Sequence, residues 1–179
     1  MERTGSGGAR PGAVGAVTYD VRGGGRPWFA VAAIPGLVHS AISAYWMVGG
    51  TWLLETVGTS LVAVFAGRLW LLAPVVVVKA VVALGPLWLD RRGWPWPRIT
   101  RAVTWLAAVV LVVWGGANCV LANLALAGLL GDGPQDRAAM IGHAWLWDPL
   151  FLIWGLLLLL GLRRSRPGQP QSPAGSTLP

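Results

Sequence analysis

The sequence predicts an all-α membrane protein, a polytopic bundle of four transmembrane helices. Hydrophobic residues make up 55% of the 179 residues and charged residues only 12%, which is about half the charged fraction of a soluble domain. Four apolar runs each reach the roughly 20 residues that a helix needs to cross the hydrocarbon core of a bilayer. None of these runs alternates in ten-residue units, as the strands of a membrane barrel do, so helices are the expected spans.

The expected elements follow one another in a simple order. Residues 1–27 are rich in glycine and arginine and are expected to form a disordered cytoplasmic tail. The membrane domain is expected at residues 28–162, with helices at about 28–49, 69–89, 102–130 and 140–162. Residues 163–179 are dominated by proline, serine and glycine and are expected to form a second disordered cytoplasmic tail.

The connection between the first two helices, residues 50–67, is itself half apolar. Its leucine, valine and phenylalanine residues recur at helical spacing, with polar residues largely between them. This pattern indicates a short amphipathic segment in the membrane interface. The segment either covers the bundle as a lid or is a loop that rests on lipid, and the sequence leaves both alternatives open.

Arginine placement predicts the orientation. The tail before the first helix, the connection between helices two and three, and the segment after helix four together hold eleven arginines. The opposite side holds only Arg68 and Arg137. Because positive residues accumulate on the cytoplasmic side, both termini are expected in the cytoplasm of a multi-pass protein of the cell (plasma) membrane.

Four polar side chains are expected in one layer of the bundle, one from each helix: His39, Lys79, Asn118 and Asp148. Ionisable groups at membrane depth cost about 2.5–3.5 kcal/mol on insertion scales, so they indicate function by default. From the rise of a helix, Lys79 and Asp148 differ in height by only about one turn, and they are expected to face each other. One interpretation is a binding site; the other is a buried ion pair that fixes the helix register.

Three further polar residues lie nearer the outer surface and could line an entrance: His143, Asn123 and Glu55. Polar residues at an interface are also ordinary, so this assignment carries less weight. The Asp148-Pro149 pair predicts a kink in the fourth helix, because proline frees a carbonyl of the preceding turn.

The remaining counts exclude several classes of protein. A single cysteine, Cys119, cannot form an internal disulfide, a redox pair or a zinc cluster. There is no phosphate-binding loop, HExxH or GxSxG motif, so no metal and no cofactor are expected. Haem is not expected, because His39 and His143 are separated in depth by roughly 12 Å at helical rise. No nucleic-acid partner is expected either, because the positive charges lie between long apolar runs.

Two stretches of sequence carry a family resemblance. They are the segment from His39 through Tyr45-Trp46 to Gly49-Gly50-Thr51-Trp52, and the segment from His143 through Trp147-Asp148-Pro149. They resemble an uncharacterised bacterial family of small four-helix integral membrane proteins, known as a domain of unknown function, over roughly residues 28–165. The resemblance implies four membrane helices and no established activity.

Three functions remain compatible with the sequence. We expect a small non-enzymatic membrane protein whose polar layer binds a lipid or small molecule. The first alternative is a membrane enzyme that acts on a lipophilic substrate, with His39 and Asp148 as its acid–base pair. The second alternative is a small transporter. The expected partners are membrane lipids and either a small lipophilic ligand or a second copy of the chain.

Overall fold

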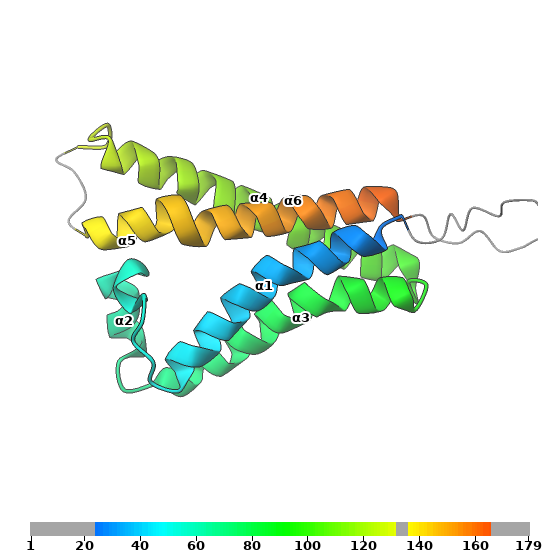
Figure 1. Ribbon diagram of the computed structural model, residues 1–179, viewed down its shortest axis with the longest axis horizontal. Helices are drawn as coiled ribbons and strands as arrows, with labels where there is room; N and C mark the ends of the chain where they lie inside the picture. The colour runs from blue at the N-terminus through cyan, green and yellow to red at the C-terminus, as the bar shows by residue number, and fades with distance from the viewer. Residues whose placement is uncertain (1–23, 132–135, 166–179) are drawn as a thin grey trace, which may run out of the picture.

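The computed structural model of the protein describes residues 24–131 and 136–165. Most of the two expected tails therefore lies outside the described residues. The described chain is helical and contains no strand, and four of its helical segments are long and apolar enough to cross a membrane (Figure 1). The expected fold class, an all-helical chain with four membrane-spanning helices, is confirmed.

The spanning helices come in sequence order as follows. The first is α1, Arg26–Met47. The second is the short 3-10 turn η3, Leu69–Leu71, followed by α3, Leu72–Arg91. The third is α4, Pro97–Leu126. The fourth is continuous but composite: α5, Arg137–Gly142, a π-helical turn η4, His143–Trp147, and α6, Asp148–Arg164.

The helix ends differ from the expected ones for identifiable local reasons. The third helix begins at Pro97 instead of residue 102, because the fixed φ of proline suits a first helical turn. It ends at Leu126 instead of residue 130, where Gly128 at φ +72 and a hydrogen bond from Leu129 N to Leu124 O close a Schellman motif. Residues 26–27 and 163–164, expected in the tails, belong to α1 and α6.

Where the sequence predicts a kink at Asp148-Pro149, the structure has a π-helical turn just before these residues. The π-helical turn ends at Trp147, immediately before Asp148 and Pro149. A π-helical turn adds one residue to the turn and so changes the direction of every following side chain. The side chains on α6 therefore face differently from those of an uninterrupted helix.

The helices form two packed pairs, and the pairs contact each other mainly through α1 and α6. α4 packs along α6, α1 packs along α3, and α1 also packs on α6, whereas α3 and α4 touch only sparsely. The two pairs diverge toward the end of the molecule that carries α2, Thr59–Phe65 (Figure 1). Glycines permit the close contacts: a Cβ at Gly36 would overlap Trp154, and one at Gly155 would overlap the α4 backbone at Ala108.

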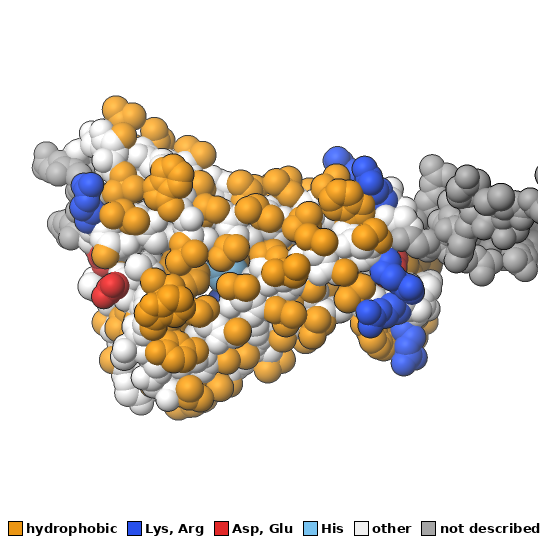
Figure 2. Space-filling model, viewed as in Figure 1, with side chains coloured by type: hydrophobic (Ala, Val, Ile, Leu, Met, Phe, Trp, Pro, Cys, Tyr) orange, Lys and Arg blue, Asp and Glu red, His pale blue; other side chains and the backbone are white. Residues whose placement is uncertain are grey.

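The main core lies where the pairs converge, toward the other end. Phe29, Trp94, Trp154, Leu158 and Leu162 are buried there. The same end carries most of the described arginines, and Figure 2 shows a dense group of basic side chains at that end of an otherwise hydrophobic surface. We refer to this half as the arginine-rich half and to the other as the α2 half.

Candidate functional site

A cavity of about 410 Å³ lies in the α2 half, between the diverging helix pairs. This volume is within the range of small-molecule sites, about 300–1,000 Å³. The wall is mostly apolar and comes from α1, α3, α4, α6 and the segment between α1 and α3. Its polar members are His39, Ser43, Thr51, Lys79, His143 and Asp148. Figure 2 shows histidine atoms in a recess among hydrophobic side chains.

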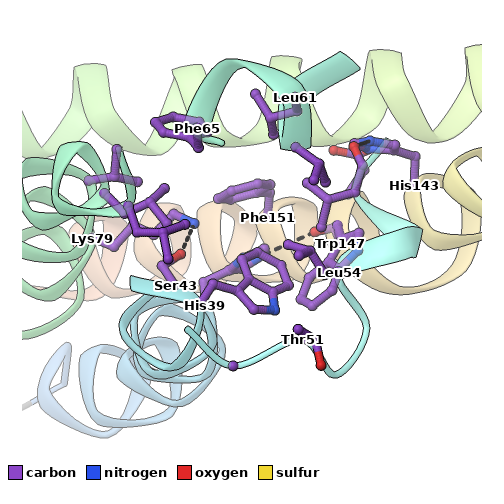
Figure 3. Close-up of a pocket in the computed structure, with 18 of the residues that line it drawn as sticks. His39, Ser43, Thr51, Leu54, Leu61, Phe65, Lys79, His143, Trp147 and Phe151 are labelled. Atoms are coloured by element: carbon purple, nitrogen blue, oxygen red, sulfur yellow. Dashed lines mark hydrogen bonds and ion pairs between the residues drawn. The ribbon is translucent and has the colours of Figure 1, made fainter. Parts of the chain in front are cut away.

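The segment between α1 and α3 covers this cavity. It contains a 3-10 turn, η2 (Leu54–Thr56), and the helix α2. Leu54, Val57, Leu61 and Phe65 line the cavity, and Figure 3 shows Leu61 and Phe65 on one side of it. Of the two alternatives that the sequence left open, the structure therefore has the lid.

Hydrogen bonds attach the lid to the fourth helix. The indole Nε1 of Trp147 donates to Thr56 Oγ1 at 3.0 Å, and His143 Nε2 lies 3.3 Å from the carbonyl oxygen of Val57. Outside the membrane span, the Thr59 amide donates to Asp136 Oδ2 at 3.0 Å. No residue of α2 itself is buried, so these few bonds and the contacts of the apolar side chains hold the lid.

His39 forms one wall of the cavity and is only 3% exposed. Its Nε2 lies 3.1 Å from the carbonyl oxygen of Trp147, so this nitrogen carries the proton and donates. Its ring stacks on Phe151 with centroids 3.9 Å apart. His39 is thus held in one orientation by the π-helical turn and by α6.

Lys79 reaches the cavity from α3, as the layer of polar residues predicts. Its Nζ donates to Ser43 Oγ on α1 at 2.8 Å and lies 5.7 Å from the centroid of the Phe151 ring, a cation–π contact. Figure 3 shows Lys79 at one end of the cavity and His143 at the other, with Phe151 between them.

The prediction that Lys79 and Asp148 pair with each other is wrong. Asp148, only 1% exposed, pairs with His143 of the preceding turn, whose Nδ1 lies 2.8 Å from Asp148 Oδ2. The π-helical turn brings these two side chains, five residues apart, onto the same face. Lys79 and Asp148 line the same cavity but form no ion pair, so the sequence predicted their shared surroundings and not their partners.

Of Asn118 and the three outer polar residues, only His143 lines the cavity. His143, expected only at an entrance, is a central member of the site. Asn118 and Asn123 donate to carbonyls of their own helix, at Trp114 and Cys119, and neither lines the cavity. Glu55 is exposed on the lid and also lies outside the lining. In α4, therefore, the apolar Trp114 contributes to the cavity, and the amides do not.

Three important residues were missed at the sequence level: Ser43, Trp147 and Phe151. Ser43 is four residues after His39, which places both on one face of a helix, so this spacing was an available signal. Phe151 and Trp147 were indistinguishable from other apolar residues of the fourth run. Within the described residues, no group of three histidine, cysteine or acidic side chains could hold a metal ion.

The comparisons with known proteins give one result. A search of curated proteins gave no match, and a search of solved structures gave none. A family model described as "Protein of unknown function (DUF3995)" matches residues 36–158, which include every polar residue of the cavity wall. Because the match covers 123 of the 179 residues, this chain belongs to the DUF3995 family.

Proposed function

We propose that this small membrane protein is a binding module that holds a lipophilic ligand in the cavity beneath α2. The observation that carries the proposal is the combination of a mostly apolar wall with a few polar groups that converge from α1, α3 and the fourth helix. Apolar cavities with a small number of placed polar groups are the usual form of ligand sites. A purely structural polar cluster would be expected to close on itself and leave no cavity.

Access from the bilayer supports the same proposal. α3 and α4 touch only sparsely, so the two helix pairs do not form a closed ring on that side. Trp114 lines the cavity from α4 while 61% of its surface is exposed. The wall of the cavity therefore reaches the lipid-facing surface, and a hydrophobic molecule has a route from the membrane that avoids water.

The experiment is native mass spectrometry of the purified full chain, with a matched pair of variants on α3. Val75 lines the cavity, whereas Val77 is 59% exposed and does not. We expect wild type and Val77→Trp to retain a lipophilic molecule from the expression host, and Val75→Trp to lose it. Equal retention by the two variants, or no retained molecule in any sample, would contradict the proposal.

An enzyme remains the second candidate, and one observation favours it in altered form. The acid–base pair expected from the sequence, His39 with Asp148, is not formed, because the 2.8 Å contact of Asp148 is with His143. A half-buried histidine paired with a buried carboxylate beside a cavity has the geometry of a general base and its orienting group. Chemical change of the molecule retained by wild type, absent in His143→Gln, would favour this candidate.

We further propose that both termini face the cytoplasm across the cell membrane. Arginine placement supports this orientation. In a Cys119→Ser background, an impermeant thiol reagent added to intact cells should label a cysteine at Ser60, on α2 of the lid, and spare one at Arg98, at the start of α4. Both positions are exposed, so the opposite labelling pattern would reverse the orientation.

A further inference from the structure

Lys79 is a cation in the cavity wall that lacks a matching anion. An ammonium group has three N–H donors. In the described part of the chain, one donates to the neutral hydroxyl of Ser43, and the group lies over the ring of Phe151. No described carboxylate lies within 4.0 Å of its Nζ. Two donors and one full positive charge are thus left to whatever occupies the cavity.

The other ionisable groups of the wall do not offset this charge. Both ring nitrogens of His143 face acceptors, the Asp148 carboxyl at 2.8 Å and the Val57 carbonyl at 3.3 Å. Because both contacts are with acceptors, His143 can donate to both of them only as an imidazolium, whose charge the Asp148 carboxylate balances. His39 needs only one proton, on Nε2, to make its bond to Trp147. The net charge of the wall is therefore that of Lys79.

A second donor lies beside Lys79. The Ser43 side chain is buried, at 2% exposure, and its oxygen accepts from Lys79. Among the described residues its own hydroxyl proton meets no acceptor. An ammonium and a hydroxyl on facing helices, both at the cavity wall, can together bind the oxygen atoms of one anionic group.

The remaining wall suits an apolar tail. On α3, Leu72, Val75 and Lys79 line the cavity at helical spacing, so an apolar strip leads from the ammonium toward the α2 end. Phe65 and Leu61 of the lid cover the same space (Figure 3). The wall thus carries the ammonium of Lys79 at the end that lies deeper in the bundle and the His143–Asp148 pair at the opposite end, with the apolar strip between them.

Resting on the proposed function, we infer that the ligand is an amphiphile with an anionic head group, a carboxylate or a phosphate monoester. The head group binds Lys79 and Ser43, and the alkyl tail lies under α2. Because the ammonium is half-buried in a mostly apolar wall, its attraction for an anion is screened less than at an open surface. A neutral amphiphile of the same length would leave the ammonium unpaired.

The experiment compares four amphiphiles of one chain length: hexadecanoate, hexadecyl phosphate, hexadecanol and hexadecylamine. Retention by the purified full chain is measured by equilibrium dialysis with labelled compounds. We expect the wild type to retain the two anions at least about tenfold better than the alcohol, and the amine least. In Lys79→Met the preference should disappear, whereas Lys79→Arg should keep it.

The outcomes separate the two proposals. If anion and alcohol bind equally to the wild type, the head-group inference is overturned and the lipophilic site stands. If none of the four compounds binds, the proposed function fails as well. Acetate and inorganic phosphate are added as competitors, and displacement by either at concentrations similar to hexadecanoate would show a small-anion site without a tail. Because the first comparison uses wild type, it does not depend on the folding of a variant.

Discussion

The two halves of this molecule use the same helices in different ways. In the arginine-rich half the helices touch across glycines, and large side chains such as Phe29, Trp154 and Leu158 are fully buried. In the α2 half the same helices diverge, a cavity of about 410 Å³ separates them, and no residue of α2 is buried. The first half is packed like a protein interior and the second like a binding site.

The polar groups show the same contrast. In the arginine-rich half, Arg101 donates to the carbonyl oxygen of Leu162 at 2.6 Å and to Ser165 Oγ at 2.8 Å, which satisfies the end of α6. Trp94 Nε1 donates to Asp90 there. In the α2 half, Lys79 and Ser43 retain donor capacity toward the cavity. The comparison teaches that these polar groups of the first half are satisfied within the protein, whereas Lys79 and Ser43 of the second half keep donors for the proposed ligand.

The largest effect is expected from a substitution in the arginine-rich half. A Cβ at Gly155 would lie 2.8 Å from the backbone oxygen of Ala108 and 2.7 Å from Val112. Gly155→Leu must therefore separate α4 from α6, and overpacking of this kind costs up to about 3 kcal/mol. Thermal unfolding in detergent measures the loss.

The control for that variant is Gly85→Ala on α3. A Cβ at Gly85 meets no atom within 4 Å, so this variant should not be destabilised, and the higher helix propensity of alanine should stabilise it by up to about 1 kcal/mol. Equal destabilisation by the two variants would mean that the helices of the first half are not packed as tightly as the structure has them.

A medium effect is expected from the buried pair of the α2 half. Asp148→Asn removes the charged partner of His143, and a hydrogen bond to a charged group is worth about 1.5–3 kcal/mol. In a double-mutant cycle with His143→Gln, the two substitutions should be coupled by about 1–2 kcal/mol. The cycle of Asp148→Asn with Lys79→Met should instead be additive within about 0.5 kcal/mol. Strong coupling in the second cycle and none in the first would restore the pairing expected from the sequence.

The smallest effect concerns the attachment of the lid. Asp136 accepts hydrogen bonds from the amides of Ala139 and Thr59, both at 3.0 Å, and these bonds lower the pKa of its carboxyl group. Because the bonds favour the carboxylate, they are fully present above the ordinary aspartate pKa of about 4 and are lost as the pH falls through the lowered value. The protection factors of the amides at residues 59–65, measured against the intrinsic exchange rate at each pH, should therefore fall only in acid.

Asp136→Asn provides the matched control for the lid. Its amide cannot carry the negative charge, so exchange at residues 59–65 should be faster already at neutral pH and should lose its acid dependence. The exchange of buried amides near Trp154 should be unchanged in the same sample. If the acid dependence persists in Asp136→Asn, another group must attach the lid.

Helical rise selected His39, Lys79 and Asp148 as neighbours in depth, and all three line one cavity, but it did not predict which side chains meet. Direction around a helix changes by 100° for each residue, so a small uncertainty in the helix ends decides which neighbour a side chain meets. The π-helical turn before Asp148 adds such a rotation, and this is why Asp148 meets His143 instead of Lys79.

The asparagines of α4 do not line the cavity, for a related reason. Asn118 was expected in the polar layer because of its depth alone. In the structure its amide donates to the Trp114 carbonyl one turn earlier, which is available to any polar side chain on a helix without help from a neighbour. Depth therefore selects candidates for a membrane site, but only the packing of the helices shows which candidates face inward.

By itself, the sequence determined the fold class, the four spans and the short amphipathic segment, because apolar length and periodicity follow directly from the thickness of a bilayer and the geometry of a helix. Tertiary structure alone decided the rest. The helices pack as two pairs, and α2 covers the cavity between them. Asp148 pairs with His143, and Lys79 contacts the Ser43 hydroxyl and the Phe151 ring. The two contacts of Lys79 join residues 36 or more positions apart, and the Asp148–His143 pair depends on a π-helical turn, so no local pattern specifies either.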